Sequence, residues 1–264
     1  MSELGTQSPA ASSKGNAAQH RQDSGAKSAQ LRGNWRRRLK RTVVALVAMV
    51  LVGPPLQCAL LNWVDPPVTG TMLQRTWQHW DATGDWTLPA YTWVDLEEMP
   101  RSVPTAAMSS EDRSFLSHDG FDWVAIRRAW HRYQTKPTAR LVGGSTISQQ
   151  VARNAFLAQN RSWLRKGLEA WYTIWLEALV SKRRILEVYV NIAEMGPMVF
   201  GIGAASQHWF GKPCRNLALS QAATIIALLP SPRHWTPQLP HVQRRARWIV
   251  RSPVTLPKRV AIAE

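Results

Sequence analysis

Hydrophobic residues form one continuous run near the N-terminus, and further along the chain they recur at helical spacing. The continuous run covers residues 42–63 and contains no charged residue. A helix of this length would span about 30 Å, which is the thickness of the hydrocarbon core of a bilayer. The pattern therefore predicts a transmembrane helix over residues 42–63, and Pro54 and Pro55 are expected to bend it.

The residues that flank this run predict its orientation. A basic segment, residues 36–41, precedes the run, and Asp65 follows it. The positive-inside rule then places the N-terminus in the cytoplasm and the rest of the chain on the other side. A cleaved signal peptide and a buried core helix are the alternatives, but the run is long for a signal peptide and lacks a small-x-small cleavage site. Residues 1–41, rich in Ser, Ala, Gln and Gly, are predicted to be a disordered tail.

Beyond the run, apolar residues at helical spacing predict a mostly α body over residues 64–250. Turn signals separate five predicted helices, which cover residues 123–133, 145–157, 162–180, 182–191 and 219–229. Ser145 and Ser181 are suitable N-caps for the second and the fourth. No strand run and no repeat stands out. We assign no role to residues 251–264.

Residues 64–110 are expected to be an irregular entry region with one short helix that begins near Met72. Trp77 and Trp80 on that helix have two interpretations. They either pack in the core or lie at the membrane–water interface, which tryptophan favours.

The net charge of the chain indicates which classes of partner it could bind. Lys and Arg number 33 against 17 Asp and Glu, a net charge of +16. Residues 1–41 contribute 9 − 2 = +7 of this excess, and the remainder contributes 24 − 15 = +9. Such an excess points to nucleic acid, an anionic membrane or a phosphorylated substrate. The 45% hydrophobic content excludes wholesale disorder, and two cysteines exclude a disulfide-rich scaffold.

Four stretches carry residues that suit chemistry, although each also has a purely structural interpretation. Residues 111–121 crowd ionisable groups before a glycine, as a solvated loop also does. Residues 143–154 place two glycines before a helix, where backbone N–H groups hold anions. Residues 161–169 place Arg161, Arg165 and Glu169 on one helical face if the helix begins early enough. The structural interpretation of this stretch is a ladder of salt bridges along the helix. Residues 182–191 begin with three cations, which is unfavourable at a helix N-terminus unless anions approach.

Taken together, these stretches resemble the peptidoglycan glycosyltransferase family found also in class A penicillin-binding proteins. The four segments resemble, in order, its E-D-x-x-F-x-x-H-x-G, G-G-S-T-I-T-Q-Q, R-K-x-x-E and I-L-x-x-Y-L-N elements. Ser148, Arg153 and Val190 depart from the usual Thr, Lys and Leu but keep a hydroxyl, a cation and an aliphatic group. Residues 210–232 are similar to the monofunctional members. The resemblance covers about residues 66–250 and implies a lysozyme-like catalytic domain after the transmembrane helix.

The resemblance implies that the protein polymerises lipid II with inversion at the anomeric carbon and release of undecaprenyl diphosphate. Glu111 would be the general base for the acceptor hydroxyl, and Asp112 and His118 would shape its surroundings. Cations would stabilise the leaving diphosphate with hydrogen-bonding support. The candidates are Arg153, Arg161, Arg165, Lys166, Ser145 and Gln150.

Glu169, the family's second glutamate, poses a charge problem, because a carboxylate repels diphosphate. Either Arg165 neutralises it or Mg²⁺ or Mn²⁺ bridges carboxylate and phosphate. No tightly bound cofactor is expected, and no His, Asp and Cys spacing marks a metal cage.

The resemblance also implies a place in the cell and a set of partners. The protein would be a single-pass protein of the bacterial inner membrane, with its catalytic domain in the periplasm. Lipid II, the growing glycan and the cell-wall synthesis machinery would be its partners, and nucleic acid would not. Two other functions stay open: a lytic transglycosylase that cleaves glycan with two carboxylates, and a non-enzymatic protein that binds anionic lipid or nucleic acid.

Overall fold

A long apolar helix precedes the folded body. The protein is described by a computed structural model that covers residues 38–45, 47–135, 144–160 and 162–254. The first helix, Arg38–Leu60, is long and apolar enough to cross a membrane. It begins within the stretch predicted to be disordered, because Arg, Leu and Lys are good helix formers. Residues 47–60 are helical throughout, including Pro54 and Pro55.

The chain divides into two units between Gly53 and Pro54, and residues 54–62 belong to the second unit. Cys58 and Leu61 are buried in its core. The Tyr172 hydroxyl donates to Gln57 Oε1 at 2.5 Å, and Asn62 Nδ2 donates to the Leu179 carbonyl at 2.9 Å. The end of the apolar run is therefore held by protein contacts.

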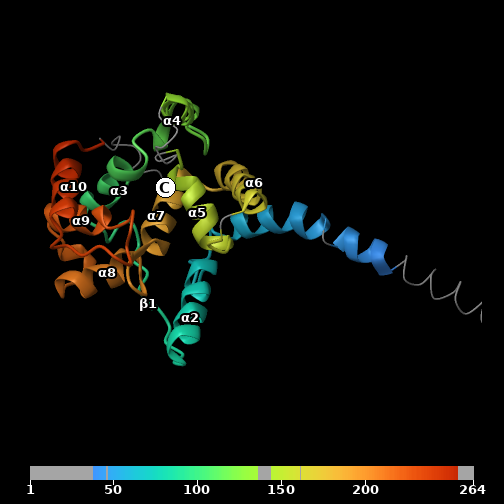
Figure 1. The fold of residues 1–264 in the computed structure, drawn as a ribbon, viewed down its shortest axis with the longest axis horizontal. Helices are drawn as coiled ribbons and strands as arrows, with labels where there is room; N and C mark the ends of the chain where they lie inside the picture. The colour runs from blue at the N-terminus through green and yellow to red at the C-terminus, as the bar shows by residue number, and fades with distance from the viewer. Residues whose placement is uncertain (1–37, 46, 136–143, 161, 255–264) are drawn as a thin grey trace, which may run out of the picture. The chain divides into compact units, whose positions relative to one another are not determined.

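The second unit is built from helices and one small sheet (Figure 1). The helices are α2 (Gly70–Thr83), α3 (Ser102–Glu111), α4 (Trp123–Thr135), α5 (Ile147–Phe156), α6 (Trp163–Leu179), α7 (Lys182–Ile192), α8 (Gly201–Phe210), α9 (Leu219–Ala227) and α10 (Pro240–Arg251). The strands are β1 (Ala90–Tyr91), β2 (Glu194–Gly196) and β3 (Val199–Phe200), in the order β1-β3-β2. β3 pairs with β1 in parallel and with β2 antiparallel. The prediction of a mostly α fold is confirmed.

Helix α7 lies at the centre of this arrangement. It packs against α3, α5 and α8, while α9 packs between α3 and α10 (Figure 1). Residues 185–192 of α7 are all buried. Asn191 is fully buried and accepts from Val94 N at 3.0 Å and donates to the Val94 carbonyl at 2.9 Å. This asparagine thus ties the segment before α3 to the central helix.

Gly201 shows how closely α8 approaches α7. Its φ is +75°, and a Cβ there would lie 2.2 Å from the Asn191 carbonyl oxygen. A side chain at this position would therefore force the two helices apart.

The five helices predicted from spacing are all present, with ends that differ by at most two residues. Within residues 64–110, the predicted short helix near Met72 is confirmed as α2, but the prediction that the rest is irregular is wrong, because this region also contains β1 and most of α3. Helix α3 is buried on most sides, including Val103, Ala106, Ala107 and Met108. A helix surrounded by protein needs no polar face, so its sequence lacks the periodicity on which prediction relies.

The tryptophans of α2 do not pack in the core as a pair. Trp77 is 55% exposed, and Trp80 stacks between Trp77 and Trp86, with ring centroids 4.8 and 5.4 Å away. The core interpretation is therefore wrong for Trp77. The interfacial interpretation stays a prediction.

Candidate active site

Glu111 ends helix α3 and its carboxylate is held by three side chains. Ser110 Oγ donates to Oε1 at 2.9 Å, Gln150 Nε2 donates to Oε2 at 3.3 Å, and Arg245 Nη2 lies 3.0 Å from Oε1. The side chain retains 15% exposure. A carboxylate that is oriented by donors and still open to solvent can accept a proton from a bound hydroxyl.

Arg245 was missed by the sequence analysis. It comes from α10, and its Nη2 also donates to Ser110 Oγ at 2.7 Å. All four segments that resemble the family elements lie more than fifty residues before it, and α10 resembles none of them. No local pattern in the chain indicates that a cation from α10 contacts Glu111.

Gln150 connects Glu111 to the buried core. The Tyr189 hydroxyl donates to Gln150 Oε1 at 3.3 Å, which leaves the Gln150 amide nitrogen to face Glu111. Burial, and then the charge of Glu111, raises the pKa of Tyr189 well above its ordinary value. Tyr189 therefore remains a donor and fixes which way the Gln150 amide points.

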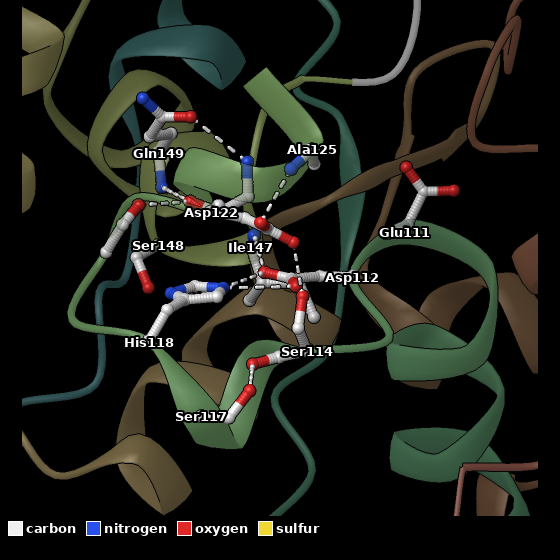
Figure 2. Close-up of polar contacts among 12 residues, drawn as sticks. Glu111, Asp112, Ser114, Ser117, His118, Asp122, Ala125, Ile147, Ser148 and Gln149 are labelled. Carbon is white, nitrogen blue, oxygen red and sulfur yellow. Dashed lines mark hydrogen bonds and ion pairs between the residues drawn. The ribbon is translucent and has the colours of Figure 1, made fainter. Parts of the chain in front are cut away.

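Asp112 and His118 bind the start of α5 instead of contacting Glu111. His118 Nε2 lies 3.1 Å from both oxygens of Asp112, and Asp112 Oδ2 accepts from Ile147 N at 3.0 Å. Figure 2 shows this cluster on one side of the loop and the Glu111 side chain apart from it. The two residues thus fix the loop that follows Glu111 against α5.

The N-terminus of α5 differs from the prediction by one residue. Thr146, not Ser145, is the N-cap, and it forms a capping box with Gln149. The Thr146 hydroxyl also donates to the Gly120 carbonyl at 2.7 Å. Ser145 is exposed immediately before the cap. Thr146 is the N-cap because at its position one hydroxyl accepts from the Gln149 backbone and donates to the preceding loop.

Asp122 caps α4 beside this cluster (Figure 2). Its Oδ1 accepts from Ala125 N at 2.7 Å, and its Oδ2 accepts from Ser114 Oγ at 2.5 Å. The Ser114 hydrogen bond in particular lowers the pKa of Asp122 below its ordinary value.

Glu169 is buried and neutralised by two cations of its own helix. Its side chain is 1% exposed, Arg165 Nη1 lies 2.6 Å from Oε2, and Lys166 pairs with Oε1. Arg165 thus neutralises Glu169 as one of the two alternatives expects, and Lys166 adds a second cation. Within the described ranges no group of three or more His, Cys, Asp and Glu could hold a metal.

Arg161 lies outside the described residues. Helix α6 begins at Trp163 with Ser162 as its N-cap.

A cavity of about 580 Å³ brings several of the predicted cations together. Gln150, Arg153 and Arg165 line it. Arg75, Glu194 and Arg233 line it as well, and the sequence analysis missed all three. Since Gln150 also donates to Glu111, one residue links the carboxylate to the cation-lined cavity. Ser145 and Lys166 are not part of its lining.

The three cations that begin α7 have carboxylate partners. Lys182 pairs with Glu177 at 2.8 Å, Arg183 pairs with Glu97, and Arg184 pairs with Glu187 at 2.8 Å and with Asp65 at 2.6 Å. These pairs remove the dipole problem noted for this helix. The basic turn is therefore structural.

Comparison with known proteins agrees with this geometry. The transglycosylase family profile matches residues 84–254, which contain α3 to α10, Glu111 and Glu169. The chain belongs to the transglycosylase family. A protein of Xanthomonas oryzae pv. oryzae, named biosynthetic peptidoglycan transglycosylase, is 43% identical over 82% of this chain and 88% of its own length. A protein of Xylella fastidiosa strain M23 with the same name is 44% identical over 82% of this chain and 88% of its own length.

The family match begins after α2. The wall of the cavity that α2 contributes, including Arg75, therefore lies outside the matched transglycosylase region. The lining residues Gln150, Arg153 and Arg165 lie inside it.

Proposed function

We propose that this transglycosylase elongates peptidoglycan glycan chains from lipid II and releases undecaprenyl diphosphate. The observation that carries the proposal is the link, through Gln150, between the Glu111 carboxylate and a cavity lined by Arg153 and Arg165. A base and a diphosphate site are the two things that this transfer requires. The printed names of the relatives support the same reaction.

In the proposed reaction Glu111 accepts the proton of the acceptor hydroxyl as its oxygen attacks the anomeric carbon of the donor. The bond from that carbon to the diphosphate breaks, and its electron pair leaves with the diphosphate. Arg153 and Arg165 stabilise the negative charge that leaves. The attack is in line, so the anomeric configuration inverts and an α-linked donor gives a β-linked product.

Glu169 acts in this proposal by holding Arg165. Its carboxylate fixes the guanidinium through a 2.6 Å contact, so the cation is oriented before the substrate binds. Lys166 supplies a second cation to Glu169, which keeps the group from repelling the diphosphate. Mg²⁺ or Mn²⁺ that arrives with the substrate is the alternative source of positive charge.

The proposed topology is a single pass through the bacterial inner membrane with the N-terminus in the cytoplasm. The apolar helix Arg38–Leu60 supports a membrane anchor. The cations of residues 36–41 support the cytoplasmic side for the N-terminus. The catalytic domain would then be periplasmic, close to a lipid-linked substrate and to other cell-wall synthesis proteins, and away from nucleic acid.

A polymerisation assay with labelled lipid II tests the proposal. The full-length protein in detergent should convert lipid II to polymer that lysozyme digests. A lytic transglycosylase would leave lipid II unchanged and would cleave preformed glycan. A protein that does neither, but binds anionic vesicles or duplex DNA, would belong to the non-enzymatic class.

A further inference from the structure

The cavity that contains Arg153 and Arg165 has a further set of charged residues that the proposed reaction does not use. Arg75 comes from α2, Glu194 begins β2, and Arg233 lies in the segment that follows α9. None of the three belongs to the four segments that carry the family resemblance.

The charges that line this cavity do not balance. Four arginines and one glutamate line it, an excess of 4 − 1 = +3. Arg165 is paired with Glu169, and Arg75 is paired with Glu194. Among the residues that the structure describes, Arg153 and Arg233 make no ion pair. Unpaired guanidinium groups in a concave polar site attract anions.

The Arg75 side chain is held in place by its neighbours. Arg75 Nε lies 3.1 and 3.0 Å from the two oxygens of Glu194, and its Nη1 donates to Gln78 Oε1 at 2.6 Å. The side chains of Arg75 and Glu194 are 15% and 9% exposed. A guanidinium has five N–H donors, and these contacts leave some of them unused. A cation held this way loses little conformational entropy when an anion binds.

We propose that Arg75 and Arg233 form a second anion subsite, which binds an anionic group of the lipid-linked substrate in the cavity that Arg153 and Arg165 also line. This inference rests on the proposed function. The substrate offers two sources of anionic oxygen, its diphosphate and the carboxylates of its peptide. Both present the oxygen pairs that a guanidinium recognises.

Four variants of the full-length protein test the subsite. Arg233→Gln removes an exposed cation for which the described residues provide no ion pair, so the fold should not change. Arg75→Gln removes the cation on α2, and Glu194→Gln removes the carboxylate that faces it. Arg215→Gln is the matched control, because Arg215 is exposed and does not line the cavity.

Steady-state kinetics with lipid II should separate a binding role from a structural one. Arg233→Gln and Arg75→Gln should raise KM roughly three- to tenfold relative to Arg215→Gln, with kcat within about twofold. Glu194→Gln should leave KM at or below the wild-type value, because it removes the negative charge from the subsite. If Arg75 and Glu194 only connect α2 to β2, Arg75→Gln and Glu194→Gln will lower kcat and the unfolding temperature together, and Arg233→Gln will have no effect. That result would overturn the proposal.

A modified substrate identifies the source of the anion. With lipid II whose peptide carboxylates are amidated, a carboxylate subsite predicts that wild type and Arg233→Gln have the same KM. A diphosphate subsite predicts that the difference persists and that Arg233→Gln weakens inhibition by inorganic diphosphate. The subsite does not exist if Arg233→Gln and Arg75→Gln match the control with both substrates.

The anion subsite can be tested even if the proposed polymerase function is wrong. If the wild-type protein makes no polymer, calorimetric titration of the full-length protein with inorganic diphosphate replaces the kinetic assay. Weaker binding by Arg233→Gln and Arg75→Gln than by Arg215→Gln would still support an anion subsite. Equal binding by all three would rule it out.

Discussion

The replacement Arg245→Gln tests whether a cation from α10 positions Glu111 for proton transfer. Arg245 Nη2 lies 3.0 Å from Glu111 Oε1 and 2.7 Å from Ser110 Oγ. A hydrogen bond to a charged group contributes about 1.5–3 kcal/mol. Because the Arg245 side chain is 30% exposed, solvent screening reduces the expected loss to about 1–2 kcal/mol. Since about 1.4 kcal/mol in the barrier is a factor of ten, kcat should fall roughly 5- to 30-fold.

The assay is the initial rate of polymer formation over a range of lipid II concentrations. Glu111 acts on the acceptor hydroxyl and does not hold the diphosphate, so kcat should fall while KM stays within about twofold. Arg245→Lys should recover part of the rate, because lysine keeps the charge but does not reproduce the position of Nη2, which contacts both Ser110 and Glu111.

Arg247→Gln is the matched control for this prediction. Arg247 lies on the same helix and is exposed. Its replacement removes the same charge without touching Glu111. Equal kcat values for the two glutamine variants would refute the positioning role of Arg245.

Four further predictions follow from the same contacts. Glu111→Gln should reduce polymerisation about 10²–10⁴-fold. Its thermal unfolding should be unchanged, because the amide oxygen can still accept from Arg245. Polymer formation at the wild-type rate would exclude Glu111 as the base. Asp112→Asn should lower the free energy of unfolding by about 1–3 kcal/mol, measured by urea denaturation, because it weakens the contacts of Asp112 with His118 and Ile147 N. The Ser114 hydrogen bond lowers the pKa of Asp122, so the stability from Asp122 is present above its ordinary pKa of 3.8 and lost as the pH falls through the lower folded value. Asp122→Ala should therefore be less stable than wild type at about pH 7, and the difference should shrink as the pH falls below the ordinary pKa. EDTA should leave the wild-type rate unchanged if Arg165 and Lys166 neutralise Glu169, whereas a loss that Mg²⁺ restores would favour the bridging metal.

Local patterns predicted the helices α4, α5, α6, α7 and α9, whose apolar residues recur at helical spacing, and Ser181 caps α7 as expected. This holds even for α7, which is buried over residues 185–192. The same reasoning failed for α3, whose apolar residues show no such spacing. It also placed the α5 cap at Ser145, one residue early, although the Thr-x-x-Gln pattern of a capping box marks Thr146, and the contact of Thr146 with Gly120 adds to this preference.

Part of the candidate site was predicted from motifs, and part was not. Gln150, Arg153 and Arg165 do line one cavity, and Arg165 does neutralise Glu169. Arg75 and Arg245 could not be predicted, because their carboxylate partners lie far away in the sequence. Arg233 could not be predicted either, because only the fold brings the segment after α9 to the cavity.

The sequence by itself determined the apolar helix before the body, the helical class and the family, because each depends on residue types at short, fixed spacing. The tertiary structure alone decided which cations meet which carboxylates. Glu111 and Arg245 are 134 residues apart in sequence, and Arg75 and Glu194 are 119 apart. Electrostatic contacts act over a few ångströms in space, so they depend on how the helices pack and leave no periodic trace along the chain.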